Sequence, residues 1–227
     1  MFVFPKRNPM KFIVASDIHG RIELAADLMQ AARENNVEHV FLLGDYSHGF
    51  QDPVQNKKDV EKLMDLLGRL DYHMILGNCD NQETAQTLGT HNLHKKTINR
   101  SGISFTGFGA SNPTPFHTAW ELSEQEIRRQ LRNLPPTSTQ SEVFLTHAPA
   151  YGTKCDLTSG GVHAGSRSLR EYVLNRKPTV MFSGHIHEAA GCEDLLGGTK
   201  VYAAGRLDAG YLLVDFKDSF NVEYERL

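Results

Sequence analysis

Five short apolar runs, each followed directly by a polar or glycine-containing motif, constrain this chain more than any other feature. The runs occupy residues 12–16, 40–43, 73–76, 143–146 and 179–183. They are partly β-branched and end at turn residues, which is typical of short buried strands. Helix-like patterns separate them, so we expect an α/β fold in which parallel strands are covered by helices. The carboxyl ends of such strands share one rim, where ligands bind.

The motifs that follow these runs place donor side chains at that rim. They are Asp17-Ile18-His19-Gly20, Gly44-Asp45, Gly77-Asn78-Cys79-Asp80, Thr146-His147-Ala148-Pro149 and Gly184-His185-Ile186-His187. Residues i and i+2 of an extended segment point to the same side, so Asp17 pairs with His19, and His185 pairs with His187. A single D-x-H motif is often only turn chemistry, because Asp bonds its own backbone. The five motifs together, in this order, indicate a metal site.

These motifs resemble the signature of the calcineurin-like metallophosphoesterases, which runs D-x-H, G-D, G-N-[HC]-[DE], a lone His and G-H-x-H. The resemblance spans about Lys11 to Ala204, and it implies a four-layer αββα fold with two packed mixed sheets flanked by helices. It also implies two divalent metal ions. The implied ligands are Asp17, His19 and His187 for the first ion, Asn78, His147 and His185 for the second, and Asp45 as the bridge. The stretch from Thr146 to Gly191 is similar to a compact prokaryotic branch of the family, which here carries Cys in the third motif.

The donor types agree with this reading of the motifs. Mixed imidazole and oxygen donors suit manganese, which we expect first, or iron, zinc, cobalt or nickel. Two divalent ions bring four positive charges and the carboxylates of Asp17 and Asp45 return two, so the site favours an anion. We therefore expect a phosphomonoester or phosphodiester to be hydrolysed by a water activated between the two metals. The catalytic candidates are Asp45, Asn78, His48 and Asp80.

Position 79 departs from the commoner family pattern. Many members carry His after the Asn, where it is thought to protonate the leaving group, with the following acid orienting it. This chain has Cys79 followed by Asp80, and a thiol is a weak hydrogen-bond donor. We therefore expect a chain that favours substrates with good leaving groups, works slowly, or protonates the leaving group through another residue such as His48 or His163. Cys79 also has the simpler interpretation of a small buried residue beside the site.

A second function class stays open. The family includes a retromer subunit that keeps the fold as an interaction scaffold, has lost its activity, and also lacks the His beside the Asn. The chain retains all the metal donors, and buried polar groups are costly without a partner, so an enzyme is favoured over a scaffold.

Weaker signals concern the borders of the cleft and the remaining elements. Tyr151, His163 and Arg167 are candidate phosphate contacts, and the helix amides near Ser168 are a candidate anion site. Capping boxes at Ser123 to Glu126 and at Ser168 to Glu171 predict two helix starts. Further helices are expected over 21–35 and 56–67, and further strands over 103–108, 200–203, 211–216 and 220–224.

Composition bounds the rest. The 227 residues predict one domain over 10–227, preceded by an extension over 1–9. The net charge of −3 argues against bulk nucleic-acid binding, so we expect a small phosphate ester as the partner. No apolar run is long enough to span a membrane. Three scattered cysteines without a signal peptide predict a cytoplasmic location, and a homo-oligomer remains open.

Overall fold

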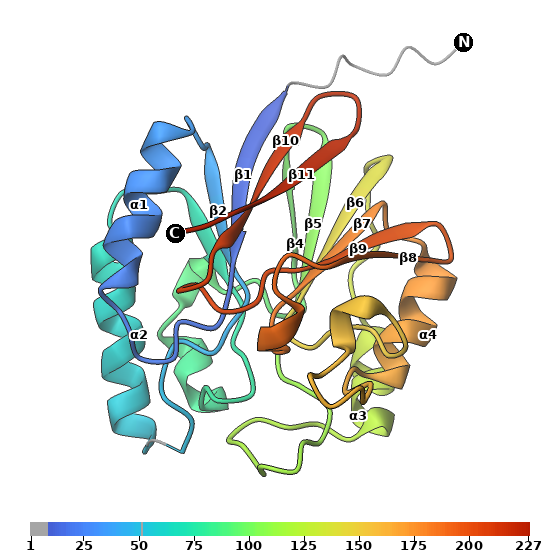
Figure 1. The fold of residues 1–227 in the computed structure, drawn as a ribbon, viewed down its shortest axis with the longest axis horizontal. Helices are drawn as coiled ribbons and strands as arrows, with labels where there is room; N and C mark the ends of the chain where they lie inside the picture. The colour runs from blue at the N-terminus through green and yellow to red at the C-terminus, as the bar shows by residue number, and fades with distance from the viewer. Residues whose placement is uncertain (1–8, 51) are drawn as a thin grey trace.

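Two β-sheets pack against each other in the middle of the molecule, and helices cover the outer face of each (Figure 1). The computed structural model describes residues 9–50 and 52–227. The order of layers is therefore helices, sheet, sheet, helices, and the expected αββα fold is confirmed. Most of the predicted extension over 1–9 lies outside the described residues.

The first sheet has five strands in the order β11-β10-β1-β2-β3. Its strands are β1 (Met10–Ala15), β2 (His39–Leu42), β3 (Tyr72–Met74), β10 (Tyr211–Phe216) and β11 (Phe220–Glu225). Strands β1, β2 and β3 run parallel, whereas β10 and β11 form an antiparallel hairpin beside β1. The parallel strands are joined by helices, so the loops after β1, β2 and β3 emerge at the same edge.

The second sheet has six strands in the order β4-β5-β6-β7-β9-β8. Its strands are β4 (Thr97–Arg100), β5 (Ile103–Phe108), β6 (Ser141–Thr146), β7 (Val180–Ser183), β8 (Glu193–Leu196) and β9 (Thr199–Ala203). Strands β5, β6, β7 and β9 are parallel, and the edge strands β4 and β8 are antiparallel to their neighbours. All predicted strands are present to within two residues at either end. The sequence did not reveal β4 and β8, which are half-exposed edge strands with little apolar pattern.

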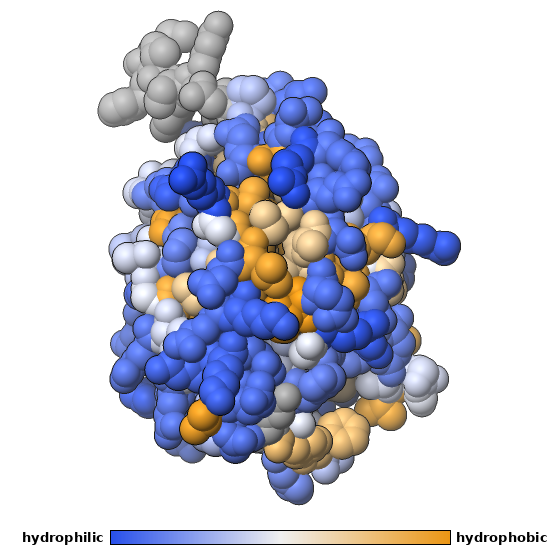
Figure 2. All heavy atoms as spheres, turned by 90° about the vertical axis from the view of Figure 1, so that its left-hand side faces the viewer, coloured by the Kyte–Doolittle hydropathy of each residue, from blue (hydrophilic) through white to orange (hydrophobic). Residues whose placement is uncertain are grey.

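Within the described residues, four α-helices cover the sheets: α1 (Leu24–Glu34) and α2 (Pro53–Leu67) on the first, α3 (Glu124–Leu131) and α4 (Arg167–Arg176) on the second. Helix α2 starts three residues before the predicted 56, because the Asp52 side chain caps the amides of Val54 and Gln55. Figure 2 shows the face that carries α1 and α2, which is mostly hydrophilic with a smaller hydrophobic area near its middle. Each described helix is too short or too polar to cross a bilayer.

The two predicted capping boxes had different outcomes. Ser123 caps α3 as predicted and accepts the amide of Glu126. The cap of α4 is Ser166 rather than Ser168, so that prediction was wrong. The reason is tertiary: the Ser168 hydroxyl donates to the carbonyl of Glu124. The Ser168 hydroxyl therefore contacts α3 and is not available to cap α4.

Strand alternation divides the apolar side chains among three cores. Along β1, Phe12 and Val14 face the second sheet, whereas Ile13 and Ala15 face the helices. Between the sheets, Phe12 meets Phe105 of β5 edge to face at 5.3 Å between ring centroids. This packing holds the carboxyl ends of both sets of parallel strands in one place, which is where the motif residues lie.

Candidate metal centre

All seven side chains predicted to bind metal come together at the carboxyl ends of the parallel strands. Asp17, His19, Asp45 and Asn78 follow strands β1 to β3 of the first sheet, and the other three follow β6 and β7 of the second. Six of the seven fall into two groups of donor atoms, Asp17 with His19 and His187, and Asp45 with His147 and His185. A further group, His19 with Asp45 and Cys79, links the two. Five of the seven, all except Asp17 and His147, also line one cavity of about 390 Å³.

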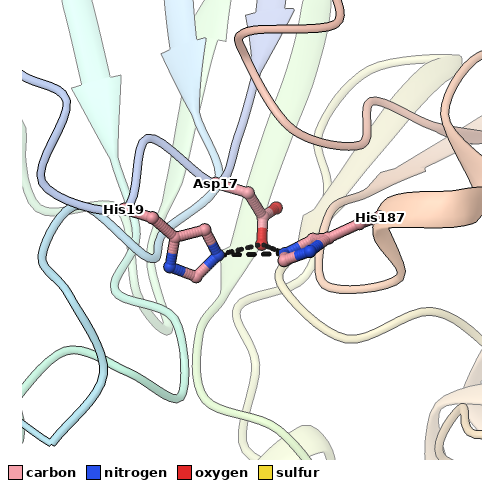
Figure 3. A group of neighbouring side chains, drawn as sticks. All are labelled: Asp17, His19 and His187. Atoms are coloured by element: carbon pink, nitrogen blue, oxygen red, sulfur yellow. Dashed lines mark hydrogen bonds and ion pairs between the residues drawn. The ribbon is translucent and has the colours of Figure 1, made fainter.

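The first group joins two segments separated by about 170 residues (Figure 3). The Oδ1 atom of Asp17 lies 3.2 Å from Nε2 of His187 and 3.5 Å from Nε2 of His19. The two Nε2 atoms are 2.9 Å apart. Three atoms that can donate electron pairs therefore point at one another. The other oxygen of Asp17 accepts the backbone amide of His185, which keeps the carboxylate oriented.

The second group is built around His147, which is fully buried. Its Nδ1 atom lies 2.8 Å from the carbonyl oxygen of Leu43, so Nδ1 carries the hydrogen. Its Nε2 atom faces Oδ1 of Asn78 at 2.7 Å and Oδ1 of Asp45 at 3.4 Å. In its neutral form the ring would turn a lone pair toward two oxygen acceptors, so the arrangement needs a cation or a proton between them.

Asp45 lies between the two groups. Its Oδ1 atom faces His147, and its Oδ2 atom lies 3.8 Å from Nε2 of His19. The backbone amide of Cys79 donates to Oδ1 at 2.8 Å, which orients the carboxylate. Asp45 therefore directs one oxygen at each group, as expected of a bridging ligand.

A pair of residues that sequence reasoning missed fixes the orientation of Asn78. The Nδ2 atom of Asn78 donates to the Thr118 hydroxyl at 2.9 Å, so Oδ1 is the atom that faces His147. The Thr118 hydroxyl in turn donates to Glu121 at 2.6 Å. No local pattern marks these two residues, because they are brought to Asn78 by the loop after β5 that also contains Phe116.

The backbone at the site is strained in a consistent way. Four of the seven candidate ligands have left-handed φ angles: 57° for Asp17, 48° for His19, 56° for Asp45 and 70° for His185. This region costs on the order of 1 kcal/mol or more for a residue with a Cβ atom. Backbone hydrogen bonds between the loops after β1 and β2, such as His19 N to the Asp45 carbonyl at 2.9 Å, hold these turns in place.

Two motif glycines provide space for the ligands. A Cβ atom at Gly77 would lie 2.1 Å from Oδ1 of Asp45, and one at Gly184 would lie 2.5 Å from Oδ2 of Asp17. Any larger residue at either position would displace a carboxylate of the site.

Asp80 takes a different place from the one that the motif suggests. Its carboxylate accepts the amides of Gly77, Asp45 and Tyr46 at 2.8 to 3.0 Å, and it is fully buried. Burial, reinforced by the charge of Asp45, raises the pKa of Asp80 to about 6. With both oxygens occupied by backbone amides, Asp80 positions the loop that carries Asp45 and does not orient a side chain at position 79.

Cys79 lies beside the ligands as a partly buried residue. Burial, and next the negative charge of Asp45, raise the pKa of the Cys79 thiol above its usual value. The residue is therefore a neutral thiol, which agrees with the simpler interpretation of a small side chain next to the site.

The other candidates border the centre. His48 is exposed and lines the same cavity of about 390 Å³ as five of the ligands. Tyr151, His163 and Arg167 line a second pocket, which His185 and His187 also border. The anion site expected near Ser168 is already filled, because the Glu124 carboxylate accepts the amides of Arg167 and Ser168 at 2.8 Å.

The protonation of the donors follows from their surroundings. Burial lowers the pKa of His147, but the carboxylate of Asp45 outweighs it and raises the value to about 9. Burial, reinforced by His147, lowers the pKa of His185 to about 4. For Asp17, burial is outweighed by His187 and His19, which hold the pKa well below its usual range. Paired carboxylates of this kind create a strong local demand for positive charge, so the residues fit divalent cations.

Comparisons with known proteins agree with this geometry. Residues 10–189 match the calcineurin-like phosphoesterase family. An uncharacterized protein of Methanocaldococcus jannaschii is 32% identical over 201 residues, which cover 85% of this chain and 86% of that protein.

Solved structures share the fold at low identity. A protein of Thermus thermophilus superposes with a TM-score of 0.74 at 16% identity and covers 96% of this chain and 99% of its own. A dimetal phosphatase from Danio rerio gives a TM-score of 0.64 at 12% identity, with 96% of both chains covered. The family match extends over most of the chain and includes every candidate metal ligand. This protein is therefore a member of the calcineurin-like phosphoesterase family.

Proposed function

We propose that the chain is a dimetal phosphoesterase that hydrolyses a phosphomonoester or a phosphodiester. The observation that carries this proposal is the convergence of seven donors from two sheets on one centre, with their lone pairs directed at one another. Buried acceptors that face each other are unfavourable without a partner. Bound cations are the partner that this set of atoms suits best.

In this proposal Asp17, His19 and His187 hold one ion, Asn78, His147 and His185 hold the other, and Asp45 contacts both. Manganese is the first candidate, with iron, zinc, cobalt or nickel as alternatives, because the donors mix imidazole with oxygen. When bound, such ions supply Lewis acidity and lower the pKa of a coordinated water. The two carboxylates leave a formal excess of two positive charges, which favours a phosphate ester over a neutral substrate.

The protein's own groups then orient the reaction. The Cys79 amide and the loop held by Asp80 fix Asp45, and Thr118 fixes Asn78. The remaining need is a proton for the leaving group, which the neutral thiol of Cys79 donates poorly. His163 is the better oriented of the two imidazole candidates, because its Nδ1 atom lies 2.7 Å from the buried carboxylate of Asp156. His48 is the other candidate, and it lines a cavity together with His19 and His187.

We further propose a small phosphate ester as the partner, rather than bulk nucleic acid or a membrane, and a cytoplasmic location. The net charge of −3 supports the first part, because bulk nucleic-acid binding depends on excess positive charge. Sedimentation analysis would show whether the chain forms a homo-oligomer.

The experiment that tests the function combines metal content with turnover. The purified chain is loaded with manganese, desalted, and assayed against phosphomonoesters and phosphodiesters. We expect about two ions per protomer and hydrolysis of at least one ester class. One of the two residues, His163 or His48, is expected to donate the proton. Replacing that residue by Gln should lower turnover of alkyl esters more than turnover of activated aryl esters.

A metal content near zero would contradict the proposal and would favour the alternative in which the fold serves as an interaction scaffold. Hydrolysis that persists unchanged after chelation would place the activity elsewhere or in a contaminant.

A further inference from the structure

A second, larger hollow lies next to the metal centre. It has a volume of about 910 Å³ and is bordered by His185 and His187. The smaller cavity that contains most of the candidate ligands shares these two histidines with it, and also shares Phe116. Phe116 therefore lies at the boundary between the two cavities. A group attached to a phosphate at the metal centre would have direct access to the larger pocket.

The walls of the larger pocket are mostly apolar. They include Pro113, Pro115, Phe116, Val162 and Ile186. Phe116 is 69% exposed and Val162 is 62% exposed, which is unusual for large apolar side chains that border the same concave surface. Exposed apolar surface of this kind, placed beside polar chemistry, is characteristic of a ligand-binding site.

The polar groups of the pocket do not create a cation site. The Glu124 carboxylate is occupied by the amides of Arg167 and Ser168, and Glu188 accepts the amide of Ser159 at 3.0 Å. The guanidinium of Arg167 lies over the Tyr151 ring, 3.9 Å from its centroid. This stacked pair presents a planar face, to which a flat ligand group can add.

The apolar wall is tied to the metal centre by hydrogen bonds. Glu121 accepts the amides and hydroxyls of Thr114 and Thr118, which lie two residues before and two residues after Phe116. Thr118 also accepts from Asn78, a candidate metal ligand. The position of Phe116 is thus set by the same carboxylate that orients Asn78, so the pocket is organised before a ligand arrives.

We propose that this pocket binds the organic group of the ester, and that this group is large, flat and mostly apolar, of the size of a fused aromatic ring. The inference rests on the proposed function, because the phosphate must lie at the metal centre. The volume exceeds what a phosphate with a short alkyl group would fill, and the two exposed apolar side chains and the stacked Arg167–Tyr151 pair match an aromatic group.

The test uses two phosphonates that cannot be hydrolysed, methylphosphonate and 2-naphthylmethylphosphonate. Calorimetry on the manganese-loaded protein measures the affinity of each. We expect the naphthyl compound to bind about tenfold more tightly or better, since aromatic contacts contribute a few-fold to tenfold each in addition to burial. Val162→Ala should reduce this preference by about threefold or more while leaving the affinity for methylphosphonate unaffected, and Phe116→Ala should reduce the preference by about threefold or more.

Leu195→Ala is the matched control, because Leu195 is 65% exposed on β8 and borders neither hollow. Equal affinities for the two phosphonates, or failure of both to bind, would overturn the inference. So would a preference that is lost in Phe50→Ala instead of Phe116→Ala, since Phe50 borders only the smaller cavity.

A parallel assay with methyl p-nitrophenyl phosphate separates the two proposals. If this small ester is hydrolysed but the naphthyl compound is not preferred, the proposed phosphoesterase function stands and the proposed role of the pocket is rejected. A naphthyl preference that depends on Phe116, without turnover of any ester, retains the binding site and removes the proposed enzymatic function.

Discussion

Two groups of histidine and aspartate side chains lie at opposite ends of the first sheet. One is the candidate metal centre at the carboxyl ends of β1, β2 and β3. The other consists of His39 and His73, with Asp71, at the amino ends of β2 and β3. Both have the composition of a metal site, and their atoms are similarly close, so composition and proximity alone do not distinguish them.

The difference lies in where the nitrogen atoms point. In the group of His39, His73 and Asp71, each nitrogen of His39 has its own neighbour: Nε2 lies 3.0 Å from Nδ1 of His73, and Nδ1 lies 3.1 Å from Asp71. The two rings are within 22° of parallel planes, and Arg100 lies 3.7 Å from the same carboxylate. This is a chain of pairwise contacts next to a cation. In the metal centre the lone pairs of several residues converge instead, and this convergence is the feature that indicates metal binding.

The largest expected effect comes from neutralising the carboxylate that contacts both donor groups. Asp45→Asn should reduce hydrolysis by more than the roughly 100-fold typical of residues that only support a ligand. The fold should persist, as judged by circular dichroism, because the amide keeps the shape of the side chain. Asp71→Asn is the matched change in the second group and should leave kcat/KM unchanged. If both variants, or neither, lose activity, the distinction between the two groups fails.

Next in size is the effect of the Thr118–Glu121 support. Thr118→Val removes the hydroxyl that holds the Asn78 amide, and about a 10- to 100-fold loss of metal affinity or activity is expected. Manganese titration followed by turnover measures both quantities. Thr97→Val, which removes a threonine pair between β4 and β5, is the control. A loss of turnover with normal metal affinity would show that Thr118 acts on something other than Asn78.

Metal removal should destabilise the protein. Ions that bind only the folded chain add about 2.7 kcal/mol at a concentration 100 times their dissociation constant. Chelation should therefore lower the urea midpoint of unfolding, and the four left-handed ligand residues would lose the contacts that offset their strain. Chelation should lower the urea midpoint of His73→Asn by the same amount, if the ions bind only at the candidate metal centre. If chelation no longer lowers the midpoint of this variant, the metal binds at His39, His73 and Asp71 instead.

The smallest expected effect is on the pH dependence of stability, and it comes from the group of His39, His73 and Asp71. Burial, reinforced by the neighbouring His39, lowers the pKa of His73 to about 4. A histidine with a lowered pKa contributes stability above its unfolded value of about 6.5, and this contribution is lost as the pH falls toward 4. Unfolding free energy should thus decrease between about pH 7 and pH 5, by on the order of 1 kcal/mol more in the parent chain than in His73→Asn. Equal pH dependence of the two chains would contradict the assignment.

Local sequence determined much of this protein. The apolar runs and the helix patterns depend on side-chain periods of two and 3.6, which are properties of neighbouring residues, and they located the strands that carry the site. The five motifs likewise identified the donors from Asp17 to His187, because each donor follows its strand directly. The αββα fold followed from the resemblance that these motifs carry.

Tertiary structure decided which partner each polar group found. The sequence pattern assigned the α4 cap to Ser168 and an orienting role to Asp80, yet α3 engages Ser168 and backbone amides occupy Asp80. It contained no sign of the Thr118–Glu121 support, or of the place of Phe116 in the pocket that Tyr151, His163 and Arg167 border, since both arise from loops that meet only in the folded chain. The physical reason is that a hydrogen bond depends on distance and direction in space, whereas a motif records only separation along the chain.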